Sequence, residues 1–83
     1  MATESIQPNS SEIRVLQVNI KGCQMAAIQL EHYIKEHNVD IVLLQEPFVK
    51  KFHVTNVPRG YEYFPKNTCY HPQAAIICRQ DLL

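Results

Sequence analysis

Two short apolar runs joined by an amphipathic segment constrain the fold of this chain more than any other feature. Residues 13–20 read IRVLQVNI, and residues 40–45 read DIVLLQ. Neither run alternates between apolar and polar residues as a half-exposed strand does, so each predicts a strand buried on both faces. Between the two runs, in residues 23–37, apolar side chains recur at the spacing of one helix face.

The order strand, helix, strand occupies about 34 residues, a length typical of a βαβ unit, whose strands are parallel. Asn38 follows the helical pattern and suits the left-handed position beyond a helix C-terminus. The expected buried side of the helix consists of small and apolar residues, namely Cys23, Ala26, Ala27, Leu30, Tyr33 and Ile34.

The rest of the chain predicts two further strands. We expect a loop at residues 48–60, a strand at 61–64, turns at 65–73 and a strand at 74–78, after a disordered lead-in at residues 1–12. The fold class is therefore α/β with a βαββ order. One helix covers only one face of such a sheet, so a partner chain or the missing half of a larger domain is expected on the other face.

Composition narrows the class of protein. Of 83 residues, 46% are hydrophobic, and eight basic residues balance eight acidic ones, which argues against a disordered tail and against nucleic-acid binding through bulk positive charge alone. No apolar run is long enough for a membrane span, and no secretory signal is visible. We therefore expect an intracellular protein without a membrane partner.

Three cysteines, at positions 23, 69 and 78, are expected to be free thiols in a reducing compartment. Cys69, His71 and Cys78 invite comparison with a zinc site. They contain no CxxC pair, and only one histidine lies in reach, so they do not match a closed structural zinc site.

Asn19 and Glu46 are the candidate site residues. Each follows a predicted parallel strand at its carboxyl end, where open α/β sheets bind their ligands. A carboxylate, an amide oxygen and water suit Mg²⁺ better than zinc. Pro47 disfavours a helical backbone at Glu46 and should hold it extended. Spacing alone also allows the alternatives, in which Asn19 is a turn residue and Glu46 a solvated strand end.

These segments carry a resemblance to a known family. Residues 13–19 (IRVLQVN), 40–48 (DIVLLQEPF) and 72–82 (PQAAIICRQDL) resemble the start of the endonuclease/exonuclease/phosphatase superfamily. More narrowly, they resemble the apurinic-type endonuclease domain of non-LTR retrotransposon polyproteins, which accompanies a reverse transcriptase. The resemblance implies that residues 13–83 are the truncated N-terminal portion of a DNase-like sandwich of two layers, or four when complete.

The resemblance also implies an activity and its residues. Glu46 matches the glutamate that binds the divalent metal, and Asn19 matches the asparagine beside the metal and the scissile phosphate. Both are thus expected catalytic and metal-binding residues, with Mg²⁺ or Mn²⁺ as cofactor, DNA as substrate and hydrolytic nicking of a phosphodiester as reaction. A nuclear location follows only from this resemblance. Gln73 stands where many of these domains have arginine.

The later half of the family's domain is absent from this sequence, together with its paired Asp and Asn, its general-base histidine and the aspartate that orients that histidine. The histidines present here are predicted to be solvated or to lie on the polar side or end of the helix, namely His32, His37, His53 and His71. The fragment is therefore expected to be inactive alone.

Two other classes of function stay open. The chain could be a small α/β interaction module without catalysis, which would be indifferent to Mg²⁺. It could also bind nucleic acid without cleaving it, since Lys50, Lys51, His53 and Arg59 lie among aromatic residues in the predicted loop. The alternative for that loop is an ordinary charged surface.

Overall fold

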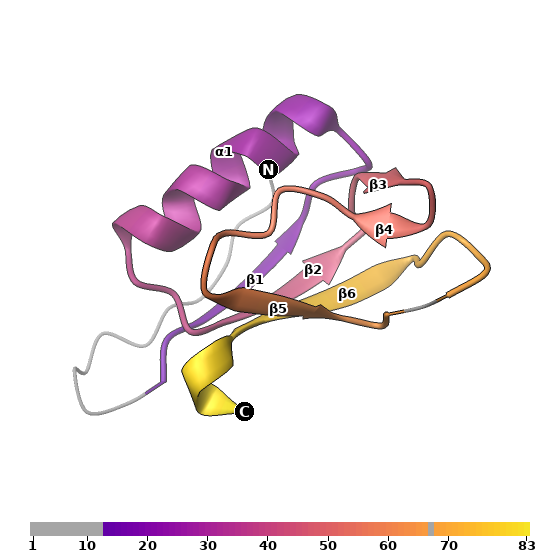
Figure 1. Cartoon of the computed structure of the whole chain (residues 1–83). Coiled ribbons are helices and arrows are strands. Elements are labelled where there is room, and N and C mark those ends of the chain that lie inside the picture. Colours follow the sequence, from indigo (N-terminus) through magenta and orange to yellow (C-terminus); the bar gives the residue numbers. More distant parts are fainter. Residues whose placement is uncertain (1–12, 67) are drawn as a thin grey trace.

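The computed structural model describes residues 13–66 and 68–83, so the predicted lead-in at residues 1–12 lies outside the described part of the chain. One helix packs on a mixed sheet of four strands (Figure 1). The elements in chain order are β1 (Val15–Asn19), α1 (Gln24–Glu36), β2 (Ile41–Gln45), β3 (Val49–Lys50), β4 (His53–Val54), β5 (Tyr61–Phe64), β6 (Ala74–Arg79) and the 3-10 helix η1 (Gln80–Leu82).

The sheet has the order β1-β2-β6-β5. The predicted parallel pairing of the first two strands is confirmed, with Val15 opposite Ile41 and Asn19 opposite Gln45. Both other pairings, β2 with β6 and β6 with β5, are antiparallel. The predicted α/β class is confirmed at this level, as a small mixed sheet with one helix.

The helix ends where the sequence predicts. Asn38 adopts a φ of 51°, the left-handed conformation that asparagine tolerates better than most residues. The predicted buried side is correct except at its start, since Cys23 is exposed whereas Ala27, Leu30 and Ile34 are buried. These side chains pack on one face of the sheet, and the shared core includes Leu16, Val18, Val42, Leu44, Ala75 and Ile77.

The other face of the sheet is open. The prediction that both long strands are buried on both faces is wrong for the described chain, because burial alternates along β1 and β2. Leu43 is 39% exposed, Phe64 40% and Ile76 45%, and these side chains surround a shallow depression together with Gln17 and Gln45. The continuous apolar run in β2 thus places a leucine on the open face of the sheet, where a half-exposed strand usually has a polar residue.

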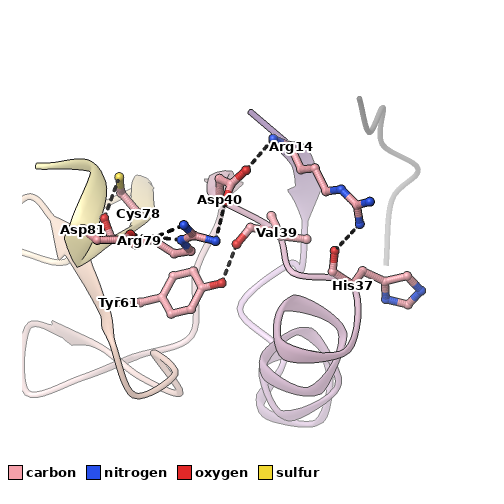
Figure 2. Close-up of polar contacts among 8 residues, drawn as sticks. All are labelled: Arg14, His37, Val39, Asp40, Tyr61, Cys78, Arg79 and Asp81. Atoms are coloured by element: carbon pink, nitrogen blue, oxygen red, sulfur yellow. Dashed lines mark hydrogen bonds and ion pairs between the residues drawn. The ribbon is translucent and has the colours of Figure 1, made fainter. Parts of the chain in front are cut away.

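Polar contacts hold the sheet together at the start of β2 (Figure 2). The Asp40 carboxylate accepts the Arg14 backbone N–H at 2.7 Å and pairs with the Arg79 guanidinium at 2.9 Å. Arg79 also makes two hydrogen bonds of 3.1 Å to Asp81. The Asp40 side chain is only 13% exposed, so this carboxylate joins the start of β1, the start of β2 and the end of β6 in a largely buried position.

Tyr61, the first residue of β5, lies at the same end of the sheet. Its hydroxyl donates to the Val39 carbonyl oxygen across the sheet (Figure 2). Burial raises the pKa of the Tyr61 phenol, the nearby Arg79 charge opposes that rise, and the Asp40 carboxylate adds to it. The neutral phenol is therefore the form that the fold stabilises.

Candidate functional site

Asn19 and Glu46 lie side by side at the carboxyl ends of β1 and β2. The Asn19 Nδ2 donates to Glu46 Oε2 at 2.8 Å, and the Lys21 backbone N–H donates to Asn19 Oδ1 at 2.8 Å. Asn19 is half-buried, whereas Glu46 is exposed. The fold thus brings together the two residues that the sequence predicts as site residues, and the Asn19 amide orients the Glu46 carboxylate.

The backbone of Glu46 differs from the expectation. The prediction that Pro47 keeps Glu46 extended is wrong, because Glu46 has a φ of 49° and so lies in the left-handed region. Its N–H donates to the Gln73 carbonyl oxygen at 2.8 Å, and its own carbonyl oxygen accepts the Gly22 N–H at 2.7 Å. These two bonds turn the chain at the strand end, and for a residue other than glycine the conformation costs about 1–2 kcal/mol.

A shallow depression surrounds the Glu46 carboxylate. It is lined by Glu46, Lys21, Phe48, Val49, His71 and Gln73, among others. Sequence reasoning assigned no site role to Lys21 or His71. Lys21 and Gly22 directly follow the predicted strand that ends near Asn19, a turn signal that could have located Lys21. His71 is far from Glu46 in sequence, and its position depends on how the loop before β6 folds.

The residues present fit a divalent metal in part. Mg²⁺ is typically held by one or two carboxylates, with water and substrate phosphate completing its coordination. Glu46 supplies one exposed carboxylate, and within residues 13–66 and 68–83 no hydrogen bond reaches its Oε1. The same described residues contain no group of three or more His, Cys, Asp or Glu side chains that could hold an ion. The ligand role of Asn19 stays a prediction, since its Oδ1 already accepts the Lys21 N–H.

The other candidate residues do not gather around Glu46. Cys69 is exposed and Cys78 is buried, and all three cysteines are free thiols as predicted. His53 is exposed as expected, but it lies in β4 rather than in a loop, and its Nδ1 is 2.9 Å from the Tyr63 hydroxyl. His37 stacks on Tyr33 at the helix end. None of these is placed to serve as a base next to Glu46.

A hairpin that the sequence did not predict lies beside the depression that Glu46 lines. β3 and β4 pair through Val49 with Val54 and Lys50 with His53, which leaves Lys51 and Phe52 as a two-residue turn. Both turn residues have positive φ, 51° and 69°. This is the pattern of a type I′ turn, which favours Asn-Gly, and a lysine and a phenylalanine there cost about 1–2 kcal/mol each.

Comparisons of the chain with family models, with curated proteins and with solved structures found no match. In the described part of the chain, no helix has both the length and the apolar character to span a membrane.

Proposed function

We propose that this chain is the N-terminal portion of a Mg²⁺-dependent DNA endonuclease domain of the retrotransposon type, inactive in isolation. One observation carries the proposal: the Asn19 amide and the Glu46 carboxylate meet at 2.8 Å at the carboxyl ends of two neighbouring parallel strands. An exposed carboxylate held by a neutral amide is suited to a hard cation that a phosphodiester also contacts. A nuclear location belongs to this proposal only through the family resemblance.

In this mechanism the chain's own residues hold the cation and orient the carboxylate that binds it. Glu46 would hold the cation, and Mg²⁺ bound there would supply stabilisation of the charge that develops on the phosphoryl oxygens. Asn19 fixes the Glu46 carboxylate through its Nδ2, and Lys21 lies in the same depression with a positive charge for a phosphate oxygen. His71 lines the same depression, but in the described part of the chain no hydrogen bond joins it to Asn19 or Glu46 and no carboxylate orients its ring. We therefore assign proton removal from water to groups supplied by another part of the domain.

The open sheet face supports the same proposal. Leu43, Phe64 and Ile76 are each about two-fifths exposed on it, an arrangement suited to a further layer. We propose that the remainder of the domain, or a partner chain, covers this face.

Metal binding is tested by NMR with Mn²⁺, whose unpaired electrons broaden signals of nearby amides. We expect broadening at the amides of residues 19–22, 45, 46, 71 and 73, and its loss in Glu46→Gln. The matched control is Glu36→Gln, which removes an exposed carboxylate from the helix and should leave the broadening at residue 46 unchanged. Broadening that persists in Glu46→Gln would refute the metal site.

Inactivity in isolation is tested by nicking of supercoiled plasmid with Mg²⁺. We expect no nicking by the wild type or by Glu46→Ala. Nicking by the wild type that disappears in Glu46→Ala would show that the chain assembles a working site without the expected base.

The open face also favours a second candidate function, a small α/β interaction module without catalysis. Under that alternative, the apolar face is the functional surface and Glu46 is a solvated strand end. The two candidates differ in their response to metal: the interaction module predicts no Mn²⁺ broadening at residue 46 and no effect of Glu46→Gln.

A further inference from the structure

We propose that the tip of the β3–β4 hairpin is a contact for single-stranded DNA, in which Phe52 stacks on an unpaired base and Lys50 and Lys51 contact the adjacent phosphates. The choice of DNA as ligand rests on the proposed function. The contact itself needs no metal, so it is testable apart from Glu46.

The turn conformation is the first observation. Lys51 and Phe52 both adopt positive φ, where asparagine and glycine fold at lower cost. The sequence therefore keeps a cation and an aromatic ring at a tight turn against its conformational preference. Strained residues of this kind gather at ligand-binding sites, where the side chain rather than the backbone is needed.

The exposure of the Phe52 ring is the second observation. Phe52 is 43% exposed at the turn, although burial of its ring would stabilise the fold. The His71 ring meets it edge-on, with centroids 5.2 Å apart and an interplanar angle of 77°. The Thr68 hydroxyl donates to the Phe52 carbonyl oxygen at 3.3 Å. The loop before β6 thus fixes the turn while the phenyl ring stays accessible for stacking.

Charge is the third observation. The whole chain has no net charge, yet residues 47–61 contain three cations, Lys50, Lys51 and Arg59, and no acidic residue. All three are exposed. In the part of the chain that the structure describes, the ion pairs involve Lys66 and Arg79, so Lys50 and Lys51 are available to phosphates. A stacking ring next to exposed cations is the combination that binds single strands without base specificity.

The position of the hairpin fits the candidate site. Figure 1 shows β3 and β4 beside the carboxyl ends of β1 and β2. Val49, in β3, lines the same depression as Glu46. At about 3.3 Å per strand residue, the turn lies roughly 10 Å along the chain from Val49, a span of a few nucleotides. A strand bound at the tip would thus pass close to the Glu46 carboxylate.

The test is fluorescence anisotropy of a labelled oligothymidylate with the full chain, in EDTA and at low salt. Loss of base stacking in Phe52→Ala should weaken binding about 5- to 160-fold, whereas Phe52→Trp should retain it. The matched control is Phe64→Ala, which removes a phenylalanine of nearly equal exposure, 40%, from the open sheet face and should leave binding unchanged. Because the assay is run in EDTA, where no metal can bind at Glu46, failure of the metal site and failure of this contact are separable.

A second variant guards against misfolding. The double change Lys51→Asn with Phe52→Gly installs the residues that the turn prefers, so the hairpin should fold at least as well, yet binding should fall at least as far as in Phe52→Ala, because a phosphate contact is also lost. Replacing Lys50 and Lys51 by glutamine should reduce the slope of log Kd against log salt by about 1.4. Absence of wild-type binding, or unchanged binding in either Phe52 variant that lacks the aromatic ring, would overturn the proposal. Equal or tighter binding of a duplex or of an oligouridylate would overturn the assignment to single-stranded DNA.

Discussion

The two ends of the sheet use carboxylates in opposite ways. At the start of β2, Asp40 is nearly buried and accepts from two partners, the Arg14 backbone and the Arg79 guanidinium (Figure 2). At the end of β2, Glu46 is exposed, receives one hydrogen bond from the neutral Asn19 amide and sits on a backbone with positive φ. One carboxylate is satisfied by the fold, and the other is left with capacity for a ligand.

This difference teaches which polar residues to assign to stability and which to function. A largely buried carboxylate needs partners, because a buried charge without them costs several kcal/mol. An exposed carboxylate on a strained backbone contributes little to stability and keeps its lone pairs for a cation. The comparison therefore predicts that substitutions at the two ends will separate folding from binding.

The largest effect is expected from Asp40→Ala. It leaves the Arg14 N–H without its acceptor and the Arg79 guanidinium with Asp81 alone, which should cost about 2–3 kcal/mol. Urea unfolding followed by circular dichroism measures this loss. Asp81, the other partner of Arg79, has a side chain that is 69% exposed. Asp81→Ala should therefore change the free energy of unfolding by less than about 0.5 kcal/mol. Equal losses of unfolding free energy in the two variants would contradict the stabilising role assigned to Asp40.

A smaller effect is expected from Tyr61→Phe, which removes the hydrogen bond to the Val39 carbonyl oxygen and should cost about 1 kcal/mol. Burial raises the pKa of the Tyr61 phenol in the folded state. Its contribution to stability is therefore complete below the unfolded pKa of about 10 and is lost as pH rises through the folded pKa. Absorbance titration of the phenols should show one tyrosine that ionises last and that is missing in Tyr61→Phe. If the last tyrosine persists in that variant, the assignment to Tyr61 is incorrect.

The smallest change in stability is expected from Glu46→Gly, and it has the opposite sign. Relief of the positive φ should slightly exceed the entropy that glycine adds to the unfolded chain, a net gain of at most about 0.5 kcal/mol. Asn38→Gly is the control, because asparagine already tolerates its φ of 51°. Thermal unfolding compares the two, and a loss above about 1 kcal/mol in Glu46→Gly would place Glu46 among the stabilising residues.

Local patterns predicted the regular elements well. The strand at Tyr61–Phe64 has the predicted bounds, and the helix at Gln24–Glu36 lies within one residue of them at each end. These elements depend on periodicity and on nearby turn residues. The β3–β4 hairpin was missed because its turn, Lys51-Phe52, lacks the glycine or asparagine that marks such turns in a sequence.

Contacts between distant residues explain what else the sequence did not predict. Asp40 finds Arg14 and Arg79 only after β1, β2 and β6 are aligned. The turn at Glu46 likewise depends on a hydrogen bond to Gln73. The sequence predicts turns at residues 65–73, but the local pattern does not predict that this segment lies beside Glu46. The convergence of Asn19 and Glu46, by contrast, followed from the rule that parallel strands end at the same edge.

The most direct test of this account is urea unfolding of the wild type and of Glu46→Gln with and without Mg²⁺, at constant ionic strength. Without Mg²⁺ the two proteins should have nearly equal free energies of unfolding. With Mg²⁺ at its dissociation constant, the wild type should gain about 0.4 kcal/mol and continue to gain as the concentration rises, whereas Glu46→Gln should gain nothing. An equal gain in both proteins, or none in the wild type, would contradict a metal site at Glu46.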